Sequence, residues 1–262
     1  MLECVVNVSE GVRPEVVAAL AATAGGDLLD VHRDAYHNRS VLTLVGEAAP
    51  RAVAADAVAR LDLRTHAGAH PRFGVVDVVP FVPLADEGMA AALAARDDFA
   101  AWIGADLGVP AFVYGPERSL PDVRRGAFAG LVPDAGPPAP HPRAGAVAVG
   151  ARPLLVAWNL WLSEPDLPRA RRVAAAVRGP QVRALGLAVG HRVQVSLNLI
   201  APEVVGPAEV WDRVAALAPV AAAELVGLVP AAVLERTDPA RWDQLDLAPD
   251  RTIEARLAAR GR

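Results

Sequence analysis

Residues 154–200 read LLVAWNLWLSEPDLPRARRVAAAVRGPQVRALGLAVGHRVQVSLNLI, and this stretch decides the expected fold. Its two ends are rich in Val, Leu, Trp and Ile, which predicts strands over 154–162 and 192–200. The alanine- and arginine-rich middle predicts a helix over 165–178, and a further strand is expected near 182–189. A strand, a helix and two strands in succession indicate a unit in which helices pack on a sheet.

The same alternation runs through the rest of the chain. Further strands are expected over 2–8, 27–32, 40–45, 75–83, 111–114 and 224–229, and further helices after Pro14, after Pro50, over 87–105 and over 208–218. A polar tail is expected to follow the last strand. We therefore predict an α+β protein of two subdomains, 1–150 and 151–262.

Proline and glycine mark two features of this pattern. Pro80 and Pro83 indicate that strand 75–83 lies at a sheet edge or ends there, because proline cannot donate a hydrogen bond to a ladder. From 128 to 151 the periodicity is lost, and Pro and Gly are dense over 132–152. We interpret this segment as either a connection between the subdomains or a loop that binds a ligand.

Composition excludes several classes of protein. The chain has 262 residues, 53% of them hydrophobic, and a formal net charge of −4, so neither a disordered chain nor a basic nucleic-acid-binding protein is expected. All 26 basic residues are arginine, which excludes lysine chemistry, and the single cysteine, Cys4, excludes a disulfide framework. The N-terminus lacks the features of a secretory signal and no apolar run reaches about 18 residues, so we expect a cytoplasmic protein that does not enter a membrane.

Chemically active residues are densest over residues 62–84, DLRTHAGAHPRFGVVDVVPFVPL. His66 and His70 have the spacing at which two histidines on a helix share a metal, but Gly68 and Pro71 disfavour a helix there. The glutamate that a zinc-hydrolase motif places after its first histidine is also missing. We therefore expect no metal site.

His70 is instead a candidate general acid–base, because the proline that follows it restricts the direction of its backbone. Asp77 could orient its ring, and Arg72 could bind a substrate carboxylate. The alternative is a polar surface turn that contains two histidines by chance. Composition and spacing leave both interpretations open.

Three further segments carry polar residues near expected strand ends. Residues 30–40, which include Asn38 and Arg39, fit either a ligand-holding loop or an exposed hairpin. Asn7 lies near the end of the first strand, where the next two polar residues fit a helix cap. In 134–152, glycines could let the backbone approach a flat ligand, with Arg143 pairing its anionic part, or the segment could be a flexible linker.

Taken together, these segments resemble the formiminotransferase domain of glutamate formimidoyltransferase, a folate enzyme of histidine breakdown. The resemblance is carried, in the family's order, by ECVVNVSEG (3–11), LDVHRDAYHNRSVLTLVG (29–46), HAGAHPRFGVVDVVPFVP (66–83), GVPAFVYG (108–115), GARPLLVAWNLWL (150–162), QVSLNL (194–199) and LVGLVP (225–230). The string HxGxHPRxGxxDxxPF is long and mixed in residue type, so it is far more specific than a glycine fingerprint.

The resemblance implies two ferredoxin-like subdomains with mixed or antiparallel sheets covered by helices. The first, 1–150, would hold the catalytic centre with His70 as acid–base, and the second, 151–262, would help to enclose tetrahydrofolate. Substrate binding or positioning is expected of Asn7, Asn38, Arg39, His66, Arg72 and Asp77. Folate contacts are expected of Gly136, Pro137, Pro142, Arg143, Gly145, Arg183 and Gly186.

The reaction implied is transfer of a formimino group from N-formimino-L-glutamate to N5 of tetrahydrofolate, which is a co-substrate, without a metal. Two other functions are compatible with the same family resemblance. The chain could be an enzyme that acts on 5-formyltetrahydrofolate, or a folate-binding protein without catalytic activity. Relatives in the family imply a homodimer. Because the sequence ends at Arg262, soon after the second subdomain, we expect a cyclodeaminase, if one takes part, to be a separate protein.

Overall fold

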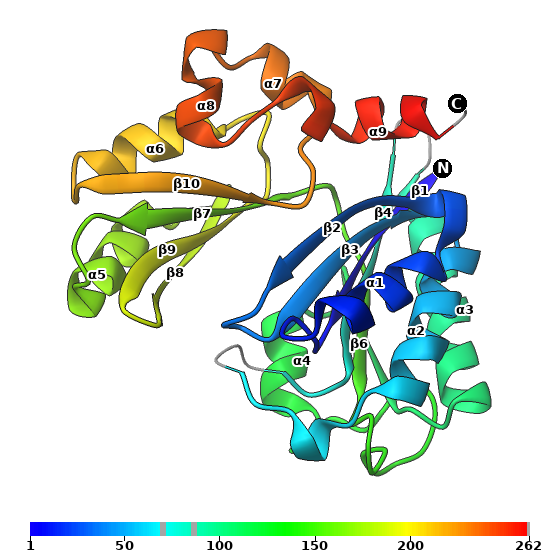
Figure 1. Cartoon of the computed structure of the whole chain (residues 1–262). Coiled ribbons are helices and arrows are strands. Elements are labelled where there is room, and N and C mark those ends of the chain that lie inside the picture. Colours follow the sequence, from blue (N-terminus) through cyan, green and yellow to red (C-terminus); the bar gives the residue numbers. More distant parts are fainter. Residues whose placement is uncertain (69–71, 85–87, 261–262) are drawn as a thin grey trace. The chain divides into compact units, whose positions relative to one another are not determined.

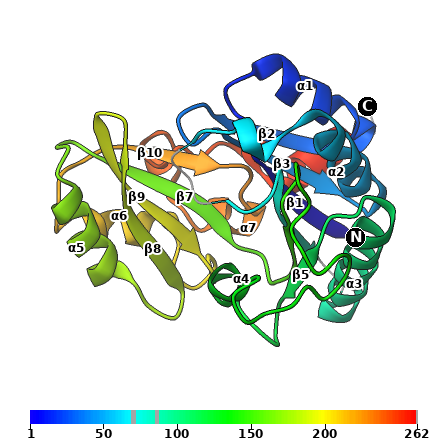
Figure 2. The same ribbon diagram turned by 90° about the horizontal axis from the view of Figure 1, so that it is seen from below.

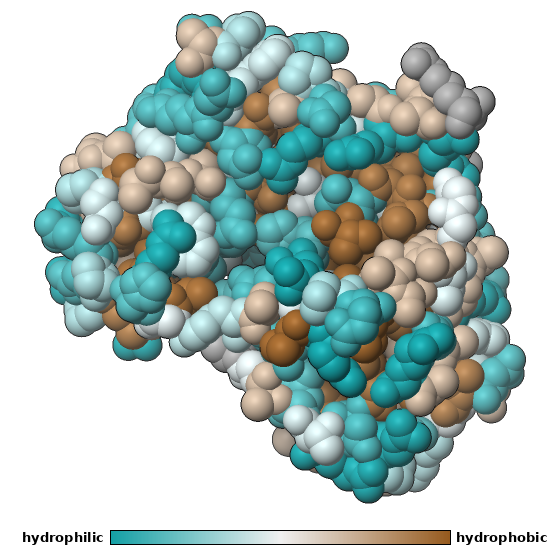
Figure 3. Space-filling model, viewed as in Figure 1, coloured by the Kyte–Doolittle hydropathy of each residue, from teal (hydrophilic) through white to brown (hydrophobic). Residues whose placement is uncertain are grey.

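The computed structural model describes residues 1–68, 72–84 and 88–260. The chain divides into two compact units, Met1–Pro153 and Leu154–Arg262, which are described separately below (Figure 1). Hydrophilic and hydrophobic residues are interspersed over the face drawn in Figure 3. Among the described residues, no helix has the length and apolar character that crossing a membrane requires.

Unit 1 is built around a six-stranded sheet. Its elements are β1 (Leu2–Val8), α1 (Pro14–Ala22), β2 (Leu28–Asp34), β3 (Arg39–Val45), α2 (Ala48–Arg60), β4 (Val76–Pro83), α3 (Met89–Asp106), β5 (Ala111–Tyr114), α4 (Leu120–Gly126) and β6 (Val147–Ala151). The strand order is β2-β3-β1-β4-β6-β5. The first four strands in this order are antiparallel to one another, and β6 runs parallel to both β4 and β5. Elements β1 to β4 therefore form a ferredoxin-like β-α-β-β-α-β motif, which α3, β5 and β6 extend.

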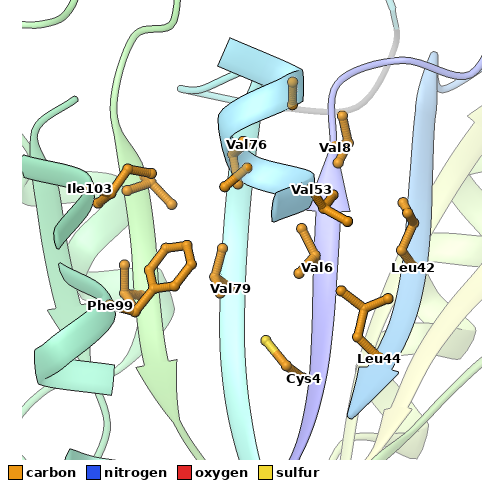
Figure 4. Packing of buried hydrophobic residues seen from close by; sticks show 14 of the residues in the cluster. Cys4, Val6, Val8, Leu42, Leu44, Val53, Val76, Val79, Phe99 and Ile103 are labelled. Carbon is orange, nitrogen blue, oxygen red and sulfur yellow. The ribbon is translucent and has the colours of Figure 1, made fainter. Parts of the chain in front are cut away.

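The two faces of this sheet carry different cores. Alternate residues Cys4, Val6 and Val8 of β1 point to the face covered by α1, α2 and α3, as strand geometry requires, and pack there in the main core (Figure 4). Phe99 of α3 fills this core, with its ring centroid 5.9 Å from that of Phe81. A smaller core beneath α4 includes Val78, Phe112, Tyr114 and Val123 and covers the other face, as the position of α4 in Figure 1 shows.

Unit 2 repeats the ferredoxin-like motif. Its elements are β7 (Val156–Leu162), α5 (Leu167–Val177), β8 (Val182–Val189), β9 (Arg192–Leu199), α6 (Pro207–Ala215), β10 (Val220–Val226), α7 (Ala231–Glu235), α8 (Trp242–Leu245) and α9 (Ile253–Ala259). The sheet order is β10-β7-β9-β8, with every pair antiparallel. Figure 2 shows α5 and α6 beside this sheet, and Trp158 of β7 is fully buried in the core beneath them. The predicted α+β class and the pair of ferredoxin-like units are confirmed.

Several local predictions are wrong. Residues 147–151 form a buried strand between β4 and β5, and the segment before it packs inside unit 1, so 132–152 is not a connection between units. The run VAVGA is short, follows a proline-rich segment and pairs with strands that are distant in sequence, so its residues alone do not predict a strand. The expected polar tail contains three short helices, α7, α8 and α9, and β10 begins at Val220 rather than at Glu224 because pairing with β7 extends it over the alanines.

Pro80 does not mark a sheet edge. β4 lies between β1 and β6, but the β1–β4 ladder is interrupted between the pairs Cys4–Phe81 and Asn7–Val78, which is the stretch that contains Pro80. An interrupted ladder needs no N–H from this residue, so proline is tolerated within an interior strand.

Candidate active site

The polar centre of unit 1 is the carboxylate of Asp77, near the start of β4. Its side chain is fully buried, with 0% of its surface exposed. Oδ2 accepts hydrogen bonds from Nη1 of Arg39 and from Nη2 of Arg124, each at 2.6 Å, and Oδ1 accepts the backbone N–H of Phe73 at 2.9 Å. These three hydrogen bonds come from different parts of the fold, so Asp77 joins β3, α4 and the loop before β4.

The sheet brings Asn7 and Arg39 to this carboxylate. Asn7 lies in β1 out of phase with the residues that face the main core, and Arg39 begins β3, which pairs with β1. Nη2 of Arg39 donates to Oδ1 of Asn7 at 2.8 Å, while Nδ2 of Asn7 donates to the carbonyl of Val5. The structure therefore unites three predicted site residues, although the described bonds of Arg39 go to protein groups.

Burial and charge act in opposite directions on Asp77. Burial alone would raise the pKa of the Asp77 carboxyl, but the positive charges of Arg39 and Arg124 outweigh that effect and hold its pKa below the ordinary value. The carboxyl is thus ionised at neutral pH. Two guanidinium groups surround one carboxylate, so the cluster of Asp77, Arg39 and Arg124 carries a net positive charge. The side chains of Arg39 and Arg124 are 15% and 24% exposed.

The loop between the HPR string and β4 is fixed at several points. The carbonyl of Phe73 accepts from Ala146, and the carbonyl of Gly74 accepts from Oγ of Ser9 at 2.7 Å. The carbonyl of Val75 accepts the backbone N–H of Ser9, and the N–H of Val75 donates to the carbonyl of Ala144. A Cβ on Gly74 would lie 1.8 Å from the carbonyl oxygen of Ala146, so only glycine fits this approach.

Three more predicted residues meet just before the HPR string. Nε2 of His66 lies 2.9 Å from the carbonyl oxygen of Asn38, whose Nδ2 donates to the carbonyl of Ala67. The guanidinium of Arg72 donates to the carbonyls of His66 and Gly68, at 2.9 and 3.1 Å. The turn at Asn38 and the chain at 66–68 are thereby fastened together.

His66 is held neutral in a defined tautomer. Because a carbonyl oxygen only accepts, Nε2 carries the ring proton, while Nδ1 is buried and has no hydrogen-bond partner within the described part of the chain. Burial lowers the pKa of His66 below its usual value; the bond to Asn38 opposes this, and the charge of Arg72 adds to it. His70, the predicted acid–base, lies outside the described residues.

The predicted folate residues of unit 1 lie on the loop before β6. Gly136 and Gly145 have positive φ angles of 83° and 72°, which favour glycine. A Cβ on Gly145 would lie 2.2 Å from the Phe73 carbonyl oxygen, so this glycine packs against the loop described above. Pro137 and Pro142 are exposed, and Arg143 donates to the carbonyls of Ala59 and Leu61.

The predicted folate residues of unit 2 lie on β8. Arg183 is exposed and pairs in register with Asn198, whereas Val182 and Ala184 point into the core. Gly186 lies against α5, where a Cβ would come 2.4 Å from the backbone nitrogen of Arg171. Its lack of a side chain is therefore explained by helix packing, and its contact with folate stays a prediction.

Sequence reasoning missed Arg124. The residue lies on α4, whose N-terminus has a capping box formed by Ser119 and Asp122. That capping signal could have revealed the helix, but not which of the chain's arginines reaches Asp77. Across the described residues, no cluster of three or more His, Cys, Asp or Glu side chains is arranged to hold a metal ion.

Comparison with known proteins identifies the family. The profile of the formiminotransferase domain, N-terminal subdomain, matches residues 1–152. This chain belongs to the formiminotransferase family. A glutamate formimidoyltransferase of Streptococcus pyogenes serotype M1 is 37% identical over 231 residues, covering 76% of this chain and 77% of that protein.

Two further relatives differ in length. A glutamate formimidoyltransferase of Thermoplasma acidophilum is 32% identical over an alignment of 234 positions, which covers 76% of this chain and 76% of that protein. The formimidoyltransferase-cyclodeaminase of Gallus gallus is 35% identical over an alignment of 275 positions, which covers 88% of this chain but 50% of that protein. The chain thus spans about half the length of the formimidoyltransferase-cyclodeaminases that it matches.

Proposed function

We propose that this chain is a glutamate formimidoyltransferase, which transfers the formimino group of N-formimino-L-glutamate to N5 of tetrahydrofolate. The proposal is carried by its similarity to two relatives of that name, each aligned over about three quarters of both chains. The first unit, which the family profile matches, is proposed to hold the reacting groups, and the second to help enclose folate.

The chemistry requires a group that both takes and gives a proton. N5 attacks the amidine carbon and forms the new C–N bond, and N5 must lose its proton. The bond from that carbon to the glutamate nitrogen then breaks, and the departing nitrogen must gain a proton. A histidine titrates near neutral pH, so we assign both transfers to His70, the histidine of the HPR string.

Substrate carboxylates are assigned to Arg39 and Arg72, and positioning to the remaining predicted residues of unit 1. A carboxylate would share the guanidinium of Arg39 with Asp77, and that of Arg72 with two backbone carbonyls. Arginine suits this sharing because its five N–H donors point in several fixed directions. Holding both substrates in one orientation can lower the activation barrier by as much as about 7–11 kcal/mol.

The function is tested by supplying the purified chain with tetrahydrofolate and N-formimino-L-glutamate, and separately with 5-formyltetrahydrofolate. We expect initial rates with the formimino donor to exceed those with the formyl compound by at least about tenfold, or about 1.4 kcal/mol. A faster reaction of the formyl compound would favour the formyl-specific alternative. Folate binding by calorimetry without turnover of either compound would identify a binding protein.

Three further expectations remain predictions. They are a cytoplasmic location, a homodimer and a separate cyclodeaminase. The names of the longer relatives combine both activities, which supports a cyclodeaminase as the enzyme that uses the product. Sedimentation of the purified chain would test the homodimer.

A further inference from the structure

We propose that Arg124 is a positioning residue of this active site: through Asp77 it fixes the backbone at Phe73, three residues after His70 in the sequence. The inference rests on the proposed function, because His70 is the acid–base only if that function is right. Arg124 itself is assigned no contact with the substrate.

The first step is the bond between Asp77 and the Phe73 amide. Oδ1 accepts this N–H at 2.9 Å, and Phe73 follows His70 by three residues. A fully buried carboxylate can serve as such an acceptor only if cations compensate its loss of hydration. The direction of this carboxylate therefore sets the direction of the loop backbone.

The second step is the difference between the two cations. Arg39 begins β3 and is bonded within the sheet to Asn7 as well as to Asp77. Arg124 lies on α4, which packs on the sheet through the fully buried side chain of Val123 in the smaller core. Its guanidinium also lies 5.7 Å from the centre of the Phe73 ring, close enough for a cation–π contact. Arg124 thus holds Phe73 twice, through Asp77 at the amide and directly at the ring.

The third step concerns the other end of the HPR segment. Arg72 is bonded to the carbonyls of His66 and Gly68, and His66 is bonded to Asn38. Only residues 69–71 stand between Gly68 and Arg72. The described contacts therefore hold the chain at Gly68 and again at Arg72 and Phe73, and we expect loss of the Phe73 contacts to slow a reaction that depends on His70.

A positioning role predicts a specific kinetic pattern. A misplacement of about 1 Å can cost about a hundredfold in rate, so Arg124→Met should lower kcat by about 10- to 100-fold. The KM values for both substrates should stay within about twofold, because no binding contact is lost. Arg124→Lys restores a cation without the planar guanidinium and should recover part of the lost kcat.

The matched control is Arg125→Met, the same substitution at the next residue of α4. Arg125 is 72% exposed and pairs with Asp122, so its loss should leave kcat unchanged. A second pair of enzymes, His70→Ala and His70→Ala combined with Arg124→Met, tests whether the two residues act as a unit. If Arg124 acts through His70, the double variant should be no slower than His70→Ala alone.

A readout independent of activity follows the anchor itself. Amide hydrogen exchange over residues 72–78 of the full chain should speed up in Arg124→Met and stay unchanged in Arg125→Met. Unchanged exchange would overturn the proposal, as would a raised KM with normal kcat, or a further loss of rate in the double variant. If the unmodified chain transfers no formimino group, the proposed function fails, and hydrogen exchange still decides whether Arg124 anchors the loop.

Discussion

Removing the Asp77 carboxylate should destabilise unit 1 strongly. In Asp77→Ala, the guanidiniums of Arg39 and Arg124 lose the carboxylate that each contacts at 2.6 Å and are left as neighbouring like charges in a partly buried place. Breaking a buried ion pair by removing one partner costs about 3–5 kcal/mol, and the partial exposure of both arginines favours the lower end, about 3 kcal/mol. At about 2–4 °C per kcal/mol, the midpoint of thermal unfolding should fall by about 6–12 °C.

The matched control is Asp56→Ala on α2. Asp56 forms an ion pair of the same length with Arg60, which is 52% exposed and one helical turn away. Such a pair contributes about 0.3–0.5 kcal/mol, so the same substitution should cost about a tenth as much as at Asp77. Urea unfolding followed by far-ultraviolet circular dichroism measures both values at pH 7.

The stability that Asp77 contributes should also depend on pH in a definite direction. Because the pKa of Asp77 in the folded chain is held below its unfolded value, its contribution is complete above the unfolded pKa of about 3.9. That contribution is lost as the pH falls through the depressed folded pKa. The stability difference between the unmodified chain and Asp77→Ala should therefore shrink on acidification below pH 4. A loss under about 1 kcal/mol at pH 7, or a difference that does not change on acidification, would refute this reasoning.

Three other predictions follow from packing. Gly145→Ala should lower the free energy of unfolding by more than about 2 kcal/mol, because the added Cβ would lie 2.2 Å from the Phe73 carbonyl oxygen. Gly25 also has a positive φ but open space around it, so Gly25→Ala should cost only about 1–2 kcal/mol. Urea titration measures both values. Phe99→Ala empties part of the main core and should cost about 3–5 kcal/mol by the same assay, and a value below 1 would contradict the packing. Cys4 is fully buried and its pKa is raised by burial, so a thiol reagent at pH 8 should modify it only on unfolding; rapid labelling of the folded chain would be inconsistent with this burial.

The sequence was most informative where local chemistry and long-range packing agree. Pro14 opens α1 and the hydrophobic runs of β1, β3 and β4 lie where their residue types predict. The strand Val147–Ala151 could not be found in this way, because its place between β4 and β5 depends on distant partners rather than on its own alanine and glycine residues. The interior position of Pro80 was missed for the same reason, since only the paired structure shows that the ladder is interrupted there.

The site was predictable as a list of residues but not as a set of contacts. The HPR string and the clusters around Asn7 and Arg39 mark the right strand ends, because polar residues beside apolar strands are visible in sequence. Their partners are decided by folding: Arg39 bonds to Asp77, and Arg124 reaches the same carboxylate from α4, which is distant in sequence. No spacing rule connects residues 39, 77 and 124.

The central claim is that this chain moves a formimino group to N5 of tetrahydrofolate by means of His70. The most direct measurement is a single reaction of purified chain, tetrahydrofolate and isotopically labelled N-formimino-L-glutamate, with both products quantified by mass spectrometry. The account predicts equal amounts of glutamate and labelled 5-formiminotetrahydrofolate, and a kcat at least about a hundredfold lower for a folded His70→Ala chain, as loss of an acid–base group requires. Absence of the labelled folate, or a His70→Ala chain of normal kcat, would contradict it.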